Sequence, residues 1–446
     1  MQKIDPQHYL NRFLQLHPKR IDLTLGRIER LLAKLGNPHL NIPPVIHVAG
    51  TNGKGSTIAY LNSILIESGY KVHRYISPHL VKFNERIQIA NREIDDEALC
   101  DLLAYVEKIN DGSAITFFEI TTATAFMAFS GIDADLTLVE VGLGGRFDAT
   151  NVIANPLLSL ITPVSLDHQE FLGKQYKTIA QEKSGIIKYR CATMSALQKP
   201  SAQKVIMSKA LQMQSPLYIE GRDYKLDHKW GGHSNMMQLK HALGPPLILP
   251  KPSLRGGHQL HNAALAVMAS LFLSSHKFCA IDQHKIREGL SKTQWPARLQ
   301  PLNGGHIARS LGASWHIICD GGHNIAAGRV LHQYFAKQRD QNATEIKHIA
   351  LVGMLSNKDA LGFLSQIACD IDLLIGVEID NHQSISMQQY MIYGKKLGVE
   401  TKVFQNLEKA LDGLKQISET EFGRVHLLIC GSLYLAGEVL KIDQQT

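Results

Sequence analysis

The chain has 446 residues, of which 44% are hydrophobic and 20% charged, and a formal net charge of +7. This length exceeds what one hydrophobic core usually serves, so two domains are expected. The modest, dispersed positive charge argues against a nucleic-acid-binding protein, and no apolar run approaches the roughly 18 residues of a membrane span. The N-terminal sequence lacks a secretory signal pattern and the six cysteines are scattered. We therefore expect a reduced, cytoplasmic, monomeric protein that binds neither nucleic acid nor membrane.

Apolar, β-branched runs alternate with helix-period segments along the chain. The runs are continuous rather than alternating, as in a parallel sheet covered on both faces. The predicted buried strands are Val45–Ala49, Leu136–Val141, Leu157–Ile161, His316–Cys319, Ile349–Gly353, Leu373–Val377 and Leu427–Cys430. A short strand is also predicted at Val72–Ile76, and a helix at Thr57–Ser68, which Gly69 can end. This order indicates an α/β architecture.

A segment of different composition, residues 190–255, interrupts this series of alternating strands and helices. Residues 190–255 are rich in Lys, Gln, Met, Gly and Pro, and we interpret them as a small irregular β subdomain. A helix is predicted at Asn262–Leu273, and a new strand–helix series begins near residue 315. We therefore predict an N-terminal domain over 1–295, a linker over 296–300 and a C-terminal domain over 301–446.

The strongest local signal is a glycine-rich turn, HVAGTNGKGS, that follows the first predicted strand. Gly50, Gly53 and Gly55 let successive backbone N–H groups face phosphate oxygens, and Lys54 supplies an ammonium group. A helix is expected to open at Ser56, whose hydroxyl is a candidate Mg²⁺ ligand. The strict GxxxxGK[ST] pattern is not met, so a glycine-rich turn without a ligand stays the alternative.

Polar residues also stand where other predicted strands end. Glu140 lies in an apolar strand, where a carboxylate is costly to bury unless it is paired or binds a cation. Oxygen is the ligand that Mg²⁺ prefers, so Glu140 is a candidate metal ligand, with a buried ion pair as the alternative. On residue chemistry alone, His168 is interpreted as a structural histidine and Lys183 as a solvated helix-face lysine.

Motifs spread from Ile21 to Ala436 resemble those of the folylpolyglutamate/dihydrofolate synthase family, bifunctional bacterial type, within the Mur ligase superfamily. They are HVAGTNGKGS (47–56), SPHL…FNERI (77–87), TFFE (116–119), VEVGLGGRFDATN (139–151), DH (167–168), EKSGIIK (182–188), HNAA (261–264), PARLQ (296–300), DGGHN (320–324), GMLSNKD (353–359) and CGSLYLA (430–436). The form GKGS, rather than GKTT, favours the folate branch over the Mur peptide ligases.

The resemblance implies an N-terminal P-loop-type ATPase domain with a mostly parallel sheet and a small β subdomain. A C-terminal Rossmann-like α/β domain follows, with the active site in the cleft between the two. The implied Mg²⁺ ligands, at two sites, are Ser77, Glu140 and His168, with Ser56. Lys183 matches a lysine that CO₂ converts into a carbamate in this superfamily. These implied roles, a metal ligand for His168 and a carbamate for Lys183, replace the interpretations made from residue chemistry alone.

The resemblance also implies residues that contact ATP and the reacting groups. The implied ATP contacts are Gly53, Lys54, Gly55, Ser56, Asn262, Arg298 and Asp320, the last at the ribose. Lys54, Lys183 and His323 are the implied catalytic residues, and Ser432 is implied near the incoming glutamate. The sequence departs from the family pattern at Ile325, where Pro is common, and at Phe147, where Leu is usual.

By this resemblance the chain is an ATP- and Mg²⁺-dependent ligase of folate and one-carbon metabolism. It joins L-glutamate to dihydropteroate and to reduced folates through an acyl phosphate. Bifunctionality is favoured by two local segments, residues 21–24 before Arg27 and Ile28 and residues 146–148, which carry most of the implied pteroate and folate contacts. These contacts are Ile21, Asp22, Leu23, Thr24, Phe118, Glu119, Arg146, Phe147 and Asp148. For Asp148 a capping role in a glycine-rich turn is the alternative. A monofunctional folylpolyglutamate synthase, a Mur-type ligase and a non-catalytic ATP-binding protein are the competing functions.

Overall fold

The computed structural model describes residues 5–19, 21–227, 235–341, 346–418 and 424–445. The chain divides into two compact units, each described here by itself. Unit 1 comprises the described residues up to Ser165, with Leu172–Ser253 and Gln259–Thr293. Unit 2 comprises Leu166–Phe171, Leu254–His258 and the described residues from Gln294 onward. Both units are α/β, which confirms the predicted fold class.

Unit 1 is built on an eight-stranded, mostly parallel sheet with the order β4-β3-β2-β5-β1-β6-β7-β8. Only β3 and β4 run antiparallel to their neighbours. The strands are β1 (Val45–Ala49), β2 (Val72–Tyr75), β3 (Ile87–Ile89), β4 (Arg92–Glu93), β5 (Leu136–Glu140), β6 (Leu158–Ile161), β7 (Ala192–Ser195) and β8 (Leu217–Ile219). The central strands are buried throughout, as their continuous apolar runs predicted.

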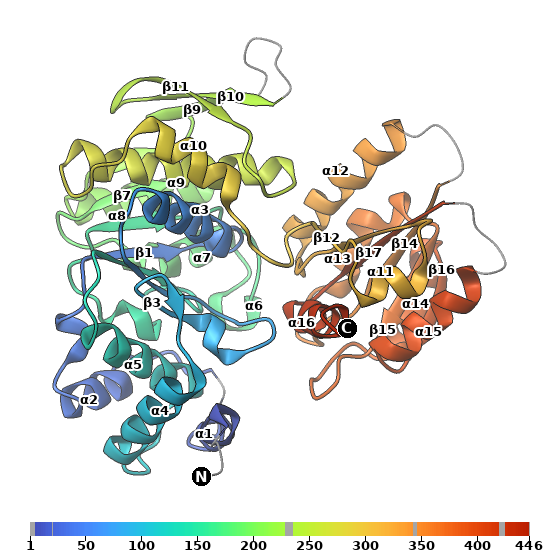
Figure 1. Ribbon diagram of the computed structural model, residues 1–446, viewed down its shortest axis with the longest axis horizontal. Coiled ribbons are helices and arrows are strands. Elements are labelled where there is room, and N and C mark those ends of the chain that lie inside the picture. The colour runs from blue at the N-terminus through green and yellow to red at the C-terminus, as the bar shows by residue number, and fades with distance from the viewer. Residues whose placement is uncertain (1–4, 20, 228–234, 342–345, 419–423, 446) are drawn as a thin grey trace. The chain divides into compact units, whose positions relative to one another are not determined.

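Helices cover both faces of this sheet. Figure 1 shows α3, α9 and α10 on one side and α2, α4 and α5 on the other. The helices of unit 1 are α1 (Pro6–Phe13), α2 (Gly26–Lys34), α3 (Lys54–Glu67), α4 (Asp96–Asn110), α5 (Phe117–Ser130), α7 (Tyr176–Lys183), α8 (Pro200–Gln212) and α10 (Gln283–Lys292), with the 3₁₀ turns η1 (Pro38–Leu40), η2 (Phe83–Arg86), η3 (Ala149–Val152) and η4 (Ser184–Ile186). Two helices include residues of both units, α6 (Gln169–Leu172) and α9 (Gly257–Ser275).

The interpretation of residues 190–255 was partly wrong. Their first part continues the main sheet through β7, α8 and β8, because the short strand on each side of α8 pairs in parallel with the preceding strand. A separate three-stranded antiparallel sheet does follow, in the order β11-β10-β9. Its strands are β9 (Tyr224–Asp227), β10 (Met236–His241) and β11 (Gly244–Pro250). Residues 228–234 of the segment lie outside the described residues.

Unit 2 contains a six-stranded sheet with the order β12-β13-β17-β14-β15-β16, parallel except for β12. Its strands are β12 (Gln300–Pro301), β13 (Trp315–Cys319), β14 (Ile346–Val352), β15 (Leu373–Val377), β16 (Glu400–Phe404) and β17 (Arg424–Cys430). Its helices are α11 (His306–Leu311), α12 (Ile325–Gln341), α13 (Ala360–Ile367), α14 (Met387–Leu397), α15 (Leu407–Ser418) and α16 (Leu433–Asp443), with the 3₁₀ turn η6 (Ala368–Asp370). The longest part of unit 2 begins at Gln294, and β12 pairs with β13, so the segment 296–300, predicted as a linker, lies within unit 2.

The strand predictions were accurate because the predicted runs are mostly apolar and buried. Val45–Ala49 and Leu373–Val377 match β1 and β15 residue for residue, and the other runs differ only at their ends. The helix after the glycine-rich turn begins at Lys54, two residues before the predicted start. No helix among the described residues is long and apolar enough to cross a membrane.

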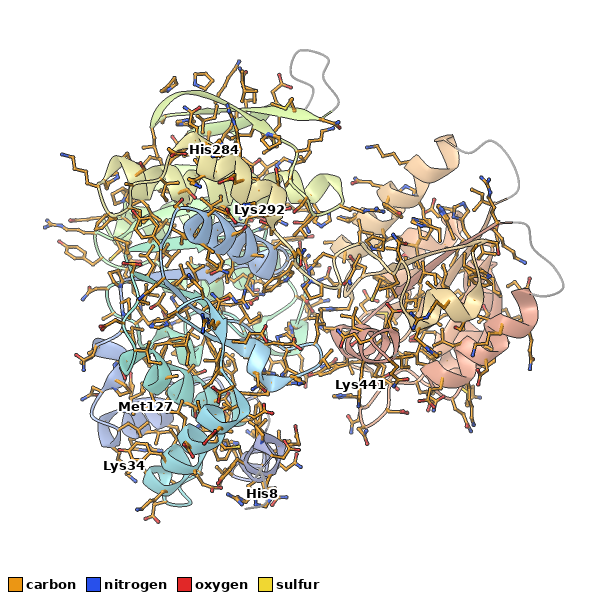
Figure 2. All side chains as sticks on the ribbon, viewed as in Figure 1. His8, Lys34, Met127, His284, Lys292 and Lys441 are labelled. Carbon is orange, nitrogen blue, oxygen red and sulfur yellow. The ribbon has the colours of Figure 1, made fainter. Side chains whose placement is uncertain are left out.

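Close packing of α10 on α3 fixes one face of unit 1. A Cβ atom on Gly289 would lie 2.6 Å from Ile64 Cα and 2.7 Å from Ile64 N. The Ser63 hydroxyl donates to Gly289 O at 2.9 Å, and Lys292 at the end of α10 pairs with Glu67 at 2.6 Å. Figure 2 labels Lys292 and shows how side chains fill the space between the ribbons. The helix that opens at the glycine-rich turn is therefore held along its length by α10.

This packing predicts that Gly289→Ala destabilises the protein. The added methyl group meets backbone rather than a flexible side chain, so the helices must separate, at a cost of about 1–3 kcal/mol in unfolding free energy. Gly26→Ala at the start of α2 is the matched control, since a Cβ there meets nothing within 4 Å. Equilibrium urea unfolding followed by circular dichroism measures both variants. Equal unfolding free energies for the two would contradict the packing argument.

Candidate active site

The glycine-rich turn connects β1 to α3 with a backbone that only glycine adopts easily. Gly50 and Gly53 have φ values of 151° and 89°, in a region that side chains disfavour. A Cβ on Gly50 would lie 1.8 Å from Thr162 Oγ1, and one on Gly53 would lie 2.4 Å from Asn262 Oδ1. Gly53 is the N-cap of α3 and makes no side-chain capping bond. The first-turn N–H groups of α3 therefore suit phosphate oxygens.

Asn262, a predicted ATP contact, lies against this turn. Its Nδ2 donates to Gln259 Oε1 at 3.0 Å, and Gln259 Nε2 donates to the Ser56 hydroxyl at 3.2 Å. Ser56 and Gln259 are fully buried. Gln259 was not singled out from the sequence, although it stands one helical turn before Asn262 on the largely apolar α9. These two amides position the turn and the Ser56 oxygen.

Glu140 ends β5, between the strands that lead to the turn and to Ser77. Its Oε1 lies 3.7 Å from Lys54 Nζ, and its Oε2 accepts a hydrogen bond from Ser77 N at 3.3 Å. Only 5% of Glu140 is exposed. Three residues predicted to bind metal and phosphate thus meet at the carboxyl end of the parallel strands, where the Glu140 carboxylate and the Ser77 side chain are the oxygen donors. This donor set fits Mg²⁺, which prefers oxygen ligands.

Lys183, at the end of α7, is buried, so its interpretation as a solvated lysine was wrong. Its Nζ donates to Gly50 O at 2.8 Å. Close packing brings α7 to this place, because a Cβ on Gly145 would lie 2.8 Å from Glu182 O and 3.1 Å from Lys183 Cα. Lys183 therefore contacts the glycine-rich turn directly. The carbamate stays a prediction.

Asp148 caps η3 and is buried. Its Oδ1 accepts from Thr150 N at 3.0 Å and from the Thr150 hydroxyl at 2.5 Å, and its Oδ2 accepts from Leu143 N at 2.7 Å. Burial raises the pKa of the Asp148 carboxyl, although these hydrogen bonds act in the opposite direction. The capping role, the alternative at the sequence level, is thus present, and the pteroate contact stays a prediction.

A chain of hydrogen bonds ties β1 to the cap at Asp148. The Thr150 hydroxyl donates to Asp148, so it accepts from His47 Nε2 at 2.8 Å. His47 is buried, and its Nδ1 has no hydrogen-bond partner among the described residues. Burial, with a smaller effect of the Lys188 charge, lowers the pKa of His47 to about 3. His47 is therefore neutral in the folded protein.

The other predicted pteroate contacts form two groups in unit 1. Arg27 joins the first group, since its Nη1 and Nε donate to Asp22 Oδ2 and Glu119 Oε2, both at 2.9 Å. Arg27 was absent from the predicted site residues, although it follows the segment Ile21, Asp22, Leu23 and Thr24. In the second group the Arg146 guanidinium lies 4.7 Å from the centre of the half-exposed Phe147 ring. Phe118 packs over Gly142, where a Cβ would lie 2.5 Å from its ring.

In unit 2, Asp320 follows β13 and accepts two backbone hydrogen bonds. Leu299 N donates to Oδ2 and Gly322 N to Oδ1, both at 2.8 Å. Burial raises the pKa of Asp320, against the effect of the Arg298 charge and of these N–H groups.

Ser432 is the buried N-cap of α16 and accepts from Tyr434 N at 3.0 Å. The ATP contacts of Arg298 and Asp320 and the glutamate contact of Ser432 stay predictions.

His168 and His323 surround Asp167 in unit 2. Lys358 Nζ lies 2.6 Å from Asp167 Oδ1 and 3.4 Å from His168 Nε2, while His323 Nε2 lies 3.4 Å from Asp167 Oδ2. Burial raises the pKa of Asp167, but His323, Lys358 and His168 outweigh it and lower that pKa well below its usual range. Lys358 was not predicted as a site residue, although the motif GMLSNKD contains it. His168 as a metal ligand stays a prediction.

Comparisons with known proteins relate the chain to dihydrofolate synthases and folylpolyglutamate synthases. The family model described as dihydrofolate synthetase, C-terminal domain, matches residues 306–442. The chain is 30% identical to the dihydrofolate synthetase of Saccharomyces cerevisiae, over 95% of this chain and 98% of the relative. Its structure resembles that of E. coli FolC in complex with DHPP and ADP, with a TM-score of 0.84, 28% identity and coverage of 98% and 97%. It also resembles the bifunctional folylpolyglutamate synthase/dihydrofolate synthase of Yersinia pestis complexed with AMPPNP and a Mn ion, with a TM-score of 0.82, 27% identity and 98% coverage of both chains.

The buried His47 predicts a pH dependence of stability. Its folded-state pKa of about 3 lies below the ordinary value of 6.5, so the unfolded chain binds more protons between these values. The stability contributed by neutral His47 is thus present above pH 6.5 and is lost as the pH falls toward the folded pKa. From pH 6.5 to about 5.5, the wild-type protein should lose about 1 kcal/mol more unfolding free energy than His47→Gln.

Urea unfolding at both pH values measures this difference. Ser159→Ala is the matched control, because Ser159 pairs with His47 in the β1–β6 register and is equally buried. This variant should be less stable at both pH values while keeping the wild-type pH dependence. The same pH dependence in His47→Gln and in the wild type would refute the assignment.

Proposed function

The chain belongs to the dihydrofolate synthase/folylpolyglutamate synthase family, and on that premise we propose that it is an ATP-dependent ligase that joins L-glutamate to dihydropteroate and to reduced folates. The observation that carries the proposal is the meeting of Lys54, Ser77 and Glu140 at the carboxyl edge of the sheet in unit 1. Lys54 Nζ lies 3.7 Å from Glu140 Oε1, and Ser77 N lies 3.3 Å from Glu140 Oε2. Nucleotide ligands of open α/β sheets bind at this edge.

The glycine-rich turn binds the phosphates of ATP. Its first-turn N–H groups and the Lys54 ammonium neutralise charge on the terminal phosphoryl group, which passes to a carboxylate of the pteroate or folate. The amine of L-glutamate then attacks the acyl phosphate, an amide bond forms and inorganic phosphate leaves. Preorganised donors suit this reaction, because most of the catalytic effect in phosphoryl transfer is positioning and electrostatic stabilisation.

Glu140 and Ser77, with Ser56, would hold the divalent metal ion. A bound Mg²⁺ would supply positive charge beside the phosphate oxygens. Glu140 is suited to this task because a cation stabilises a buried carboxylate, and the phosphates of ATP need more positive charge than the Lys54 ammonium alone supplies. The oxygen-only donor set supports Mg²⁺ or Mn²⁺ over softer metals.

Both acceptors, dihydropteroate and reduced folates, are included in the proposal. The Yersinia relative is named as bifunctional, and the E. coli relative was solved with DHPP and ADP. The segment that contains Asp22 and the turn that contains Asp148 support this choice, since both were singled out as bifunctional features. The Arg27 bridge from Asp22 to Glu119 gives the first segment a fixed position beside α5.

Purified protein with Mg²⁺, ATP and L-glutamate should release ADP with either dihydropteroate or tetrahydrofolate as acceptor. A coupled assay for ADP, with mass analysis of the glutamylated product, measures both reactions. Release with only one acceptor would reduce the proposal to a monofunctional synthase. Release with neither would overturn the ligase proposal and favour a Mur-type or non-catalytic protein.

A second test concerns the carbamate on Lys183. We expect Lys183→Ala to be nearly inactive and to be partly restored by a short carboxylic acid, which replaces the missing anion. Lys188→Ala is the control, because Lys188 is also partly buried but donates to Asn151 O at 3.2 Å rather than to the turn. Full activity of Lys183→Ala without the acid would refute the carbamate role. If the variant has low activity and no carboxylic acid restores it, the role of Lys183 is limited to its hydrogen bond to Gly50 O.

A further inference from the structure

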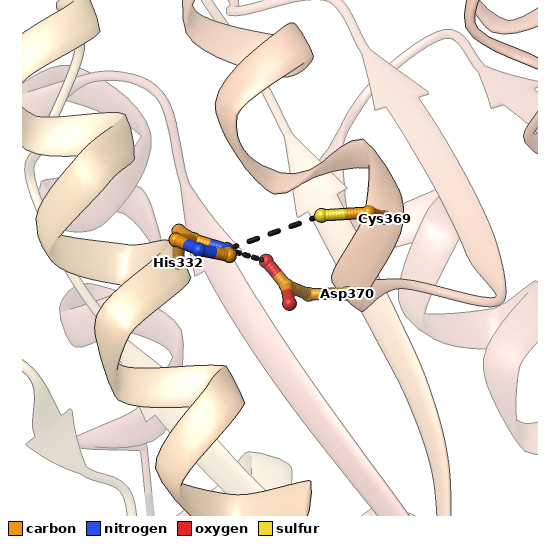
Figure 3. A group of neighbouring side chains, drawn as sticks. All are labelled: His332, Cys369 and Asp370. Atoms are coloured by element: carbon orange, nitrogen blue, oxygen red, sulfur yellow. Dashed lines mark hydrogen bonds and ion pairs between the residues drawn. The ribbon is translucent and has the colours of Figure 1, made fainter.

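Unit 2 contains a histidine, a cysteine and an aspartate whose ligand atoms converge. His332 projects from α12, while Cys369 and Asp370 are consecutive residues of η6, as Figure 3 shows. His332 Nδ1 lies 2.7 Å from Asp370 Oδ2 and 3.9 Å from Cys369 Sγ. Among the residues that the structure describes, this is the one group of three His, Cys, Asp or Glu side chains with ligand atoms within 4.8 Å of one another.

The scaffold around these three residues is well fixed. A Cβ on Gly328 would lie 3.0 Å from Phe363 O, so α12 and α13 approach closely. Leu331, beside His332, is fully buried in the same core as Ile367, just before η6. Asp370 is 4% exposed, whereas Cys369 is exposed and His332 intermediate. The carboxylate is thus held rigidly, and the other two side chains have room to adjust.

The separations fit a tetrahedral metal ion after a small adjustment. Around Zn²⁺, bond lengths of about 2.0–2.3 Å place two ligand atoms roughly 3.3–3.6 Å apart. The two separations from His332, 3.9 Å to Cys369 and 2.7 Å to Asp370, lie on either side of this range, so changes of about 0.5 Å bring these pairs into it. All three ligand atoms already lie within 4.8 Å of one another. An imidazole, a thiolate and a carboxylate also bring two negative charges, which balance a divalent cation.

The same geometry disfavours a nucleophilic triad. In such a triad one imidazole nitrogen faces the nucleophile and the other faces the carboxylate. Here Nδ1 of His332 is the atom near both Cys369 and Asp370. One nitrogen cannot relay a proton between the two groups, but it can share a metal ion with them.

The geometry points to a site for a thiophilic divalent cation, Zn²⁺ being the best match, formed by His332 Nδ1, Cys369 Sγ and an Asp370 carboxylate oxygen. Water completes the shell on the exposed side. Sulfur and nitrogen donors select Zn²⁺ over Mg²⁺, so this site takes a different metal from the one proposed beside Glu140. The ion joins α12 to η6 and stabilises unit 2 by binding only its folded form.

Cobalt(II) titration of the chelator-treated protein tests the site, because a thiolate ligand gives a sulfur-to-cobalt charge-transfer band that oxygen ligands do not. The wild-type protein should show this band, and Zn²⁺ should abolish it. Cys369→Ser should lack it, whereas Cys191→Ser, which changes another partly exposed cysteine, should keep it. His332→Gln keeps a hydrogen-bond donor for Asp370 and should weaken Zn²⁺ binding by roughly tenfold or more, since even groups that only orient ligands contribute about 10–100-fold.

A second measurement uses the unaltered protein, so that misfolding of a variant cannot decide the result. Zn²⁺ should slow the alkylation of Cys369 by iodoacetamide, as measured by peptide mass spectrometry, and leave the alkylation of Cys191 unchanged. The absence of a charge-transfer band in the wild type would overturn the proposal. Equal alkylation of Cys369 with and without Zn²⁺ would overturn it as well, and would leave His332 and Asp370 as a hydrogen-bonded contact between two helices.

Discussion

The arrangement of unit 1 depends on one buried carboxylate at the end of β5. Glu140 is 5% exposed, and a carboxylate without compensation at such a position costs several kcal/mol. Compensation comes from Lys54 at the start of α3 and from the Ser77 N–H after β2. Strands β1 and β2 flank β5 in the sheet, so both partners arrive from neighbouring strands. The strand order therefore brings Lys54 and Ser77 to Glu140, and these are the partners that its buried charge requires.

The glycine-rich turn is determined by what surrounds it as much as by its own residues. Thr162 and Asn262 occupy the space where side chains at Gly50 and Gly53 would lie. Lys183 donates to Gly50 O, and Gln259 donates to the Ser56 hydroxyl. The turn is thus fixed from the β6 end, from α9 and from α7. A turn fixed on three sides presents its N–H groups without reorganisation, which is what electrostatic stabilisation of a phosphoryl group requires.

The sequence predicts the strands well, because parallel strands buried on both faces carry an unmistakable apolar run. The glycine-rich turn after the first strand and the carboxylate within an apolar strand also predict Lys54 and Glu140, whereas Ser77 was predicted only from the family resemblance. Periodicity alone cannot predict contacts between distant segments. Lys358 and Asp167 are 191 residues apart, and burial of Lys183 depends on the close approach of its helix to Gly145. The segment 190–219 was misassigned for a related reason, since its short strands are formed by pairing of β7 with β6 and of β8 with β7 rather than by a pattern of their own.

The buried aspartates of the two units differ in how their charge is compensated. Asp148 is compensated by N–H and hydroxyl donors, and Asp320 by the Arg298 charge and two N–H groups, yet burial raises the pKa of both carboxyls. Asp167 is also buried, but His323, Lys358 and His168 outweigh burial and lower its pKa. Dipolar donors stabilise a turn, whereas a full positive charge keeps a carboxylate ionised out of water. Asp167 therefore stays charged beside His168 and His323. The Lys358 ammonium, 2.6 Å from Asp167 Oδ1, supplies the full positive charge that the N–H and hydroxyl donors around Asp148 lack.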